Sequence, residues 1–222
     1  MKLKSIYQHM EKGAAAVPNK ANCKIVFRHS IRKSIESGVG REVPLTDEGM
    51  ELAKWFGHHL NYGIGFVASS SCDRNTRTCV EILSGKGVQK DIITARNELE
   101  CPQAKDEVLS GKVFKQYNFR SDVIIHKVKT EGLPGFNTIE EASKIMLDYF
   151  FSNGNRENTV DLFCTHDFQM AILCAWLFDF DPTEENLKLE KWPMMLEGMI
   201  FWGERNHFWC SWRGQIKEFV NL

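Results

Sequence analysis

The sequence lacks the long apolar runs and the charge excess that mark several classes of protein. None of its hydrophobic stretches approaches the length of a membrane span, and its first ten residues contain no apolar core of a signal peptide. The net charge is −1 and the pI is near 6.7, so no overall positive field favours nucleic acid or an anionic membrane. We therefore predict a soluble, cytoplasmic protein whose partners are neither nucleic acids nor membranes.

Paired cysteine motifs are also missing. The seven cysteines are odd in number, include no CxxC pair and mostly lie within apolar runs. This pattern is typical of small buried side chains that stay reduced in the cytosol.

What the sequence does contain is an alternation of strand-like and helix-like patterns. With 222 residues, 43% of them apolar, the chain can build a sizeable core, and we predict a single domain over residues 1–222. The alternation from residue 23 to 178 predicts an α/β fold, a three-layer α/β/α sandwich around a mostly parallel sheet. Residues 198–213 should add an antiparallel hairpin. Residues 95–137 fit neither period and are interpreted as an inserted lid over the site.

The first candidate for chemistry follows a short buried strand. The apolar run 25–27 has the length and β-branched content of such a strand, and it leads directly into Arg28, His29 and Arg32. In open α/β sheets, ligands bind beyond the carboxyl ends of the strands. Two guanidinium groups beside an imidazole can hold a phosphate while the neutral ring nitrogen attacks phosphorus. The alternative is a solvated basic turn that contains an ordinary histidine.

Two further strand ends carry residues of the same kind. Arg74 falls in the first turn of the helix that follows the short strand 65–68, where a cation is unfavourable unless an anion accompanies it. His166 and Asp167 end the apolar run that begins at residue 159, just before a nearly uninterrupted apolar helix. A lone His-Asp pair is more often a structural hydrogen bond. Three such strand ends together indicate an anion site.

Together these pieces resemble the histidine phosphatase superfamily, which includes phosphoglycerate mutase-like and histidine acid phosphatase-like enzymes. The matching segments, in chain order, are Arg28-His29-Ser30 with Arg32, residues 44–49, residues 69–78, and Thr165-His166-Asp167. Arg32 and Asp167 look like the acid phosphatase branch, whereas the short chain looks like the phosphoglycerate mutase-like branch. Ser30 is a departure, because the family usually has glycine there and a side chain must now fit close to the phosphate.

The resemblance also implies roles for individual residues. His29 would be the nucleophile that becomes phosphorylated, Arg28 and Arg74 would hold the phosphate, and His166 would help to stabilise the transferring group. Nearby guanidinium groups disfavour protonation of the His29 ring, which keeps it ready to attack near neutral pH. We therefore predict a phosphatase that hydrolyses phosphomonoesters through a phosphohistidine on His29, with no metal and no cofactor. Its partner would be a small phosphorylated substrate or a phosphoprotein.

The leaving group needs a proton, and two carboxyl groups are candidates to supply it. Asp167 is preferred because it adjoins His166, and because the corresponding residue is the acid in the acid phosphatase branch. Glu100 competes with it, since the phosphoglycerate mutase-like branch takes its acid from a glutamate in this part of the chain.

Three other functions stay open. One is a phospho-ligand-binding or regulatory module without turnover, for which Ser30 is the hint. Another is a phosphomutase of the same superfamily. The third is a metal-dependent phosphohydrolase with His29, His166 and Asp167 as ligands, which the nearby arginines disfavour because they would repel a dication.

Overall fold

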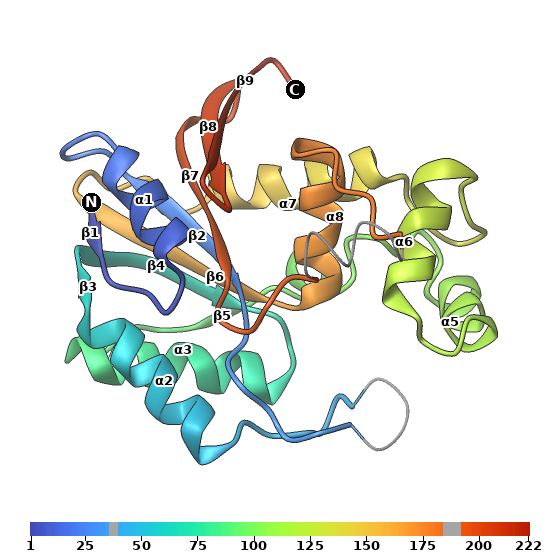
Figure 1. The fold of residues 1–222 in the computed structure, drawn as a ribbon, viewed down its shortest axis with the longest axis horizontal. Helices are drawn as coiled ribbons and strands as arrows, with labels where there is room; N and C mark the ends of the chain where they lie inside the picture. The colour runs from blue at the N-terminus through green and yellow to red at the C-terminus, as the bar shows by residue number, and fades with distance from the viewer. Residues whose placement is uncertain (36–39, 184–191) are drawn as a thin grey trace.

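The computed structural model describes residues 1–35, 40–183 and 192–222, and a seven-stranded sheet lies at its centre. The strands are β2 (Cys23–Arg28), β4 (Gly63–Ser69), β5 (Ile93–Thr94), β6 (Thr159–Thr165), β7 (Gly198–Glu204), β8 (His207–Trp212) and β9 (Gln215–Val220). Their order across the sheet is β5-β4-β6-β2-β7-β8-β9 (Figure 1). Two short strands, β1 (Lys2–Leu3) and β3 (Leu60–Asn61), form a separate antiparallel pair.

The sheet is mostly parallel, as predicted. The strands β5, β4, β6 and β2 pair in parallel, and β7 joins β2 in the antiparallel sense. Because β8 is antiparallel to β7, it points the same way as β2, which leaves β7 and β9 as the strands that run in the opposite direction. The predicted hairpin is formed by β7 and β8. The sequence did not predict β9, which extends this hairpin at the edge of the sheet.

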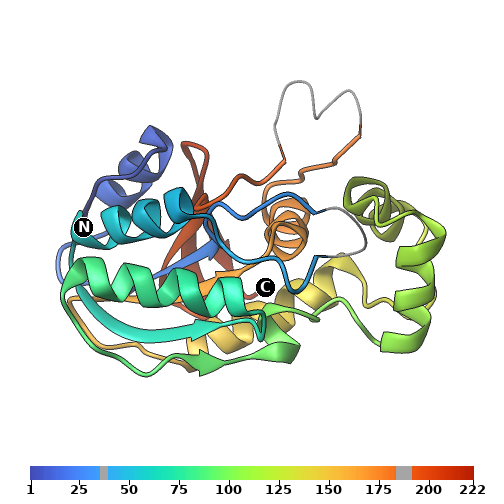
Figure 2. The ribbon, with the colours of Figure 1, turned by 90° about the horizontal axis from the view of Figure 1, so that it is seen from below.

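Helices cover both faces of the sheet and give the predicted three-layer α/β/α architecture (Figure 1, Figure 2). One face carries α1 (Gln8–Ala16), α2 (Asp47–His58) and α3 (Asp73–Lys86), and the other carries α7 (Ile139–Ser152) and α8 (Asp167–Leu177). The strands β2 and β6 are buried along their whole length, which explains why they are so apolar in the sequence. In the described part of the chain, no helix combines the length and the hydropathy needed to cross a membrane.

Side-chain caps fix where two of these helices begin. Thr46 precedes α2 and accepts a hydrogen bond from the backbone N–H of Gly49 at 3.0 Å. Thr138 precedes α7 and forms the predicted capping box with Glu141. The first turn of α2 therefore has a fixed position beside the loop that follows β2. This loop carries His29, the candidate nucleophile.

Residues 95–137, which the sequence analysis interpreted as an insertion that fits neither period, contain three helices among the described residues. They contain α4 (Arg96–Leu99), α5 (Glu107–Gln116) and α6 (Ser121–Thr130), and α5 and α6 lie on the opposite side of the molecule from α1 (Figure 1, Figure 2). Each of these helices has ten residues or fewer, so its apolar face repeats too few times for a period of 3.6 to stand out. The role of this segment as a lid stays a prediction.

Candidate active site

The parallel strands end together at one edge of the sheet, and this edge brings the predicted residues into one cavity of about 420 Å³. Arg28 lies opposite Thr165 in the ladder between β2 and β6, so His29 and His166 follow directly from paired strand ends. The centroids of the two imidazole rings are 5.7 Å apart. Arg74 enters from the first turn of α3, the helix that follows β4.

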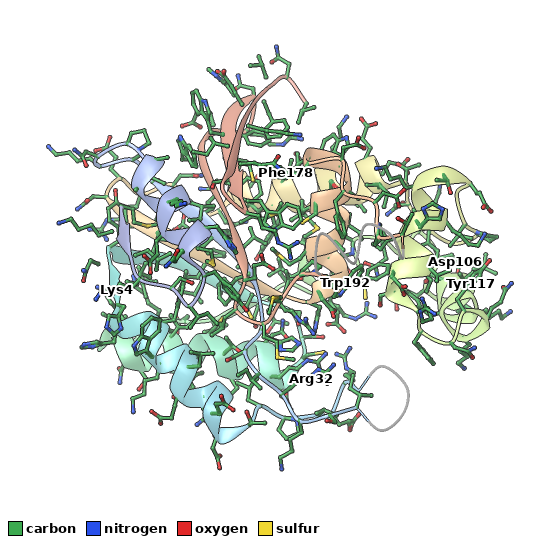
Figure 3. The ribbon with its side chains drawn as sticks, in the orientation of Figure 1. Lys4, Arg32, Asp106, Tyr117, Phe178 and Trp192 are labelled. Carbon is green, nitrogen blue, oxygen red and sulfur yellow. The ribbon has the colours of Figure 1, made fainter. Side chains whose placement is uncertain are left out.

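All six residues predicted for the site line this cavity: Arg28, His29, Arg32, Arg74, His166 and Asp167. Figure 3 labels one of them, Arg32, on the loop that follows β2. Residues that the sequence did not predict complete the walls. Arg41, Gln103 and Ser121 add polar groups, whereas Phe114, Phe119 and Phe168 add an apolar surface. Phe114 lies in α5, Ser121 begins α6, and Phe119 lies in the turn between them. These two helices therefore lie against the cavity.

His29 is held as a neutral imidazole. It is only 2% exposed, and its Nδ1 lies 2.8 Å from the backbone oxygen of Ser30. A carbonyl oxygen only accepts hydrogen bonds, so Nδ1 carries the proton and Nε2 is left unprotonated. Burial lowers the pKa of His29 well below its ordinary value, and the neighbouring His166 and Arg28 lower it further. The ring is therefore neutral near pH 7 and can attack an electrophile through Nε2.

His166 holds the side chain of Arg74. Its Nδ1 lies 3.2 Å from Nη2 of Arg74, and since a guanidinium only donates, Nδ1 must be the acceptor. The protonated Nε2 then donates to the hydroxyl of Ser70 at 2.9 Å. Burial first, and then the charge of Arg74, lowers the pKa of His166 to about 4, so this ring is neutral as well. Both ring nitrogens bond protein groups here, and the contact of His166 with a transferring group stays a prediction.

Arg28 and Asp167 form an ion pair in the cavity, with 3.0 Å between Nη2 and Oδ2. The other terminal nitrogen of Arg28 donates to the backbone oxygen of Pro193 at 2.7 Å. Burial alone would raise the pKa of Asp167, but the charge of Arg28 and a hydrogen bond with the side chain of Trp192 outweigh it and lower the pKa. Figure 3 shows Trp192 beside α8, the helix that begins with Asp167. The Asp167 carboxyl is thus ionised in this arrangement.

Glu100 forms a second ion pair in the same cavity, with Arg41. Ser71 joins the two: its hydroxyl accepts from Nη2 of Arg41 at 2.6 Å, and its backbone N–H donates to Glu100 at 3.1 Å. Burial would raise the pKa of Glu100, but hydrogen bonds from Ser71 and Arg41 lower it. Glu100 could be found from the sequence only through the resemblance, and Arg41 could not be found, because it lies in a loop without a period or a motif.

The cavity has the charge and the donors for an anion. Its described lining includes four arginines and two carboxylates, which leaves two positive charges when both histidines are neutral. The Nε atoms of Arg28 and Arg74 are buried and find no hydrogen-bond partner among the described residues. Burial, followed by the charges of Arg28 and Arg74, lowers the pKa of Arg32, as expected where cations gather. The net positive charge of the lining therefore favours an anion in this cavity.

Ser30 fits without entering the cavity. Its hydroxyl is fully buried and donates to the backbone oxygen of Gly49 at 2.6 Å, in the first turn of α2. Its backbone N–H donates to the hydroxyl of Thr78 at 3.1 Å. A Cβ on Gly49 would lie 2.1 Å from the backbone oxygen of Ile31, so only glycine lets α2 approach the loop this closely. The side chain of Ser30 is therefore used to fasten the loop that carries His29 to α2.

The described residues contain no group of three or more His, Cys, Asp or Glu side chains placed to hold a metal ion. The three ligands considered for a metal-dependent enzyme, His29, His166 and Asp167, are bonded instead to the groups named above.

Comparison with known proteins gives a match in structure and none in sequence. No protein-family model matches the chain, and no curated protein matches it. Among solved structures, a phosphoserine phosphatase from Entamoeba histolytica in complex with 3-phosphoglyceric acid aligns with a TM-score of 0.54 and 18% identity, covering 81% of this chain and 90% of that chain. A mycobacterial glucosyl-3-phosphoglycerate phosphatase aligns at 0.53 and 12%, covering 90% and 99%. The protein YhfR from Bacillus stearothermophilus aligns at 0.53 and 15%, covering 82% and 91%.

The chain has the fold of the phosphoglycerate mutase-like histidine phosphatases. The resemblance first drawn from four short segments is thereby confirmed at the level of the fold. Within this histidine phosphatase fold, the paired ends of β2 and β6 supply the two histidines, and the start of α3 supplies the mid-chain arginine. The arrangement offers an unprotonated imidazole nitrogen, guanidinium groups for an anion and two carboxyl groups, which together are the components of phosphoryl transfer.

Proposed function

We propose that the protein is a phosphatase that hydrolyses phosphomonoesters through a phosphohistidine on His29, without a metal or a cofactor. The observation that carries the proposal is the state of His29: a buried, neutral ring whose Nδ1 is fixed on the backbone oxygen of Ser30, in a cavity lined by four arginines. The histidine phosphatase fold supports it. The substrates fall in the class of small phosphorylated compounds, or of phosphoproteins.

In the first half of the reaction, Nε2 of His29 attacks phosphorus and the bond from phosphorus to the leaving oxygen breaks. Arg28, Arg32 and Arg74 offset the negative charge that spreads over the three equatorial oxygens. In the second half, water attacks the phosphohistidine, the bond from phosphorus to nitrogen breaks, and phosphate leaves. The ring nitrogen recovers its lone pair, and a carboxylate takes the proton of the attacking water.

The carboxyl group that protonates the leaving oxygen is proposed to be Asp167. Arg28, its partner at 3.0 Å, is also a ligand of the incoming phosphate. A dianion that draws Arg28 away removes the main interaction that keeps the Asp167 carboxyl ionised, and its pKa rises toward the range of a useful acid. Glu100 is the alternative, since it lines the same cavity and its own ion pair with Arg41 could loosen in the same way.

The test is a phosphatase assay over a panel of compounds. Phosphoserine, 3-phosphoglycerate, glucosyl-3-phosphoglycerate, an aryl phosphate and a phosphopeptide cover the names borne by the structural neighbours and the phosphoprotein alternative. Activity should persist in EDTA and be lost in vanadate, which mimics the transferring phosphoryl group. His29→Ala should abolish turnover and the acid-labile phosphoenzyme. His207→Ala is the matched control, because His207 is an exposed histidine on β8 that bonds Glu218 and does not line the cavity.

Two results would contradict the proposal. Loss of activity in EDTA that a divalent metal restores would favour the metal-dependent enzyme. Tight binding of phosphorylated compounds with no turnover of any of them would favour the binding or regulatory module.

A further inference from the structure

A short segment, residues 192–197, bonds both members of the ion pair between Arg28 and Asp167. The side chain of Trp192 forms a hydrogen bond with Asp167, and the backbone oxygen of Pro193 accepts one from Nη1 of Arg28 at 2.7 Å. The two contacts come from consecutive residues, so a displacement of this segment would move both of them. Whatever fixes the segment therefore also fixes the surroundings of a phosphate-binding guanidinium and of the proposed acid.

Glu197, the last residue of this segment, is bonded to the end of β2. Its backbone oxygen accepts a hydrogen bond from the backbone N–H of Arg28 at 3.0 Å, just before β7 begins. Its side chain is only 1% exposed, and Oε2 accepts from the backbone N–H of Met194 at 2.8 Å. Because the carboxylate folds back onto its own segment, any group that holds the carboxylate also holds the backbone of residues 192–197.

Arg213 is the group that holds this carboxylate. Its Nε donates to Oε1 of Glu197 at 2.8 Å and its Nη2 donates to Oε2 at 3.0 Å, and Nη2 also lies 3.4 Å from the backbone oxygen of Trp192. Arg213 and Gly214 form the turn between β8 and β9, with φ angles of 46° and 82°, as a tight two-residue hairpin turn requires. Since β8 points the same way as β2, this turn lies at the edge of the sheet where the cavity is.

Neither Glu197 nor Arg213 lines the cavity, and the proposed reaction gives them no task. Burial would raise the pKa of Glu197, but contacts with His9 and Arg213 outweigh it and lower the pKa to about 2, so the carboxyl group is ionised. A buried ion pair often adds little to stability compared with apolar side chains of the same volume. A bidentate pair does fix geometry, and this one joins a tight turn to the segment that contacts the cavity.

We propose that Glu197 and Arg213 are positioning residues, which act on the cavity through residues 192–197. Their ion pair keeps this segment where it can bond Arg28 and Asp167, so that the guanidinium of Arg28 is already oriented when a phosphate group arrives. The inference rests on the part of the proposed function that places the phosphate in this cavity, and it requires no turnover. Its consequence is that breaking the pair weakens phosphate binding through Arg28.

The experiment measures the affinity of the protein for inorganic phosphate by calorimetry. Arg28→Gln removes the guanidinium and should weaken binding by ~10- to 100-fold, the usual worth of a hydrogen bond to a charged group. Arg213→Gln leaves Arg28 in place but releases the segment, and should weaken binding by ~3- to 10-fold. The stoichiometry of each titration reports the folded fraction, so a variant that folds only in part still gives a dissociation constant for its folded molecules.

A double-variant cycle separates positioning from a merely structural role. If Arg213 acts through Arg28, adding Arg213→Gln to Arg28→Gln should change the affinity for phosphate by less than ~2-fold, because the group that it positions is gone. A loss of equal size in both backgrounds, or no loss in either, would overturn the proposal. Glu197→Gln is the second variant and should lose affinity in the same Arg28-dependent way. Arg213→Lys keeps the charge without the bidentate geometry, so its affinity should lie between those of the wild type and Arg213→Gln.

Lys24 and Asp161 supply the matched control. They form another buried ion pair, with 3.4 Å between Nζ and Oδ2 and with 2% and 0% of their side chains exposed. Lys24 lies near the start of β2, at the opposite end from Arg28, and neither member of the pair lines the cavity. Lys24→Gln should lower Tm and keep the affinity for phosphate within ~2-fold of the wild type. A loss as large as that in Arg213→Gln would mean that any buried charge defect weakens the site, and the proposal would fall.

The same titrations keep the two proposals apart. If phosphate binds and the cycle gives the expected result, but the wild-type protein hydrolyses no phosphomonoester, the phosphatase proposal fails and the inference about Glu197 and Arg213 stands. If the wild-type protein binds no phosphate, or if Arg28→Gln does not weaken binding, the phosphate site itself is wrong and both proposals fall.

Discussion

Replacing Ser30 with alanine should lower the stability of the protein and leave its chemistry nearly unchanged. The hydroxyl of Ser30 is fully buried and donates to Gly49 at 2.6 Å, and it does not line the cavity. Losing one such hydrogen bond costs about 1 kcal/mol. We place the cost at the lower end, because a carbonyl in the first turn of a helix also faces the helix's own N–H groups. For a chain of this size, 1 kcal/mol corresponds to a fall in Tm of about 2–4 °C.

The assay follows thermal unfolding and kcat/KM on the same preparations. Ser30→Ala should lower Tm by about 2–4 °C and change kcat/KM by less than ~3-fold. Ser143→Ala is the matched control. Ser143 lies in α7 and is fully buried, as Ser30 is, but its hydroxyl has no hydrogen-bond partner among the described residues. Removing an unpaired buried hydroxyl from a helix should leave Tm unchanged or raise it slightly.

A tenfold or larger fall in kcat/KM with an unchanged Tm would refute this reasoning, since it would mean that the Ser30 hydroxyl serves the phosphate. Ser30→Gly restores the residue usual in the family and gives a second check. It should be less stable than Ser30→Ala by a further ~0.5–1 kcal/mol, because glycine loses more backbone freedom on folding.

Two other predictions follow from the proposed chemistry. If Asp167 is the proton donor, Asp167→Asn should slow the hydrolysis of alkyl phosphates by ~10²–10⁴-fold. Hydrolysis of aryl phosphates should be spared, because their leaving groups need little protonation. Equal losses on both types of substrate would exclude this role for Asp167, and a selective loss in Glu100→Gln would assign it to Glu100. Burial, His166 and Arg28 lower the pKa of His29 in the native state, so the unfolded chain binds protons that the native state does not. The contribution of His29 to the free energy of unfolding should therefore be complete above pH ~6.5, the usual pKa of histidine. It should decrease as the pH drops below that value. Urea unfolding between pH 8 and 5 should show a smaller pH dependence in His29→Gln than in the wild type, and an equal dependence would show that His29 is not the buried neutral base described here.

The parts of the fold that the sequence predicted are those where the local pattern and the packing agree. The strands β2 and β6 are apolar because they are buried on both faces, and Thr46 and Thr138 mark helix starts by their own hydrogen bonds. The strand β9 was not predicted, since it alternates exposed and half-buried residues at the edge of the sheet and leaves Ile216 and Val220 in solvent.

The same contrast holds at the site. His29, Arg74 and His166 could be found because each follows a strand, and parallel strands deliver their carboxyl ends to one edge. The pairing of Arg41 with Glu100 could not be found in this way. The two residues are 59 positions apart, and a loop and the segment after α4 bring them together, neither of which has a repeating pattern.

The place of β2 in the sheet has a consequence for the nascent chain. The strand that leads to His29 is made early, yet its two neighbours in the sheet are β6 and β7, and β7 begins at residue 198, 170 residues after β2 ends at residue 28. At typical rates of synthesis, roughly 10–30 s separate these events on the ribosome. Until β6 is complete at residue 165, β2 has neither neighbour, and the edge that pairs with β7 stays open for the whole interval, as a target for chaperones and for misdirected pairing. The strand that leads to His29 is thus among the first parts of the sheet to be synthesised and among the last to have both of its neighbours.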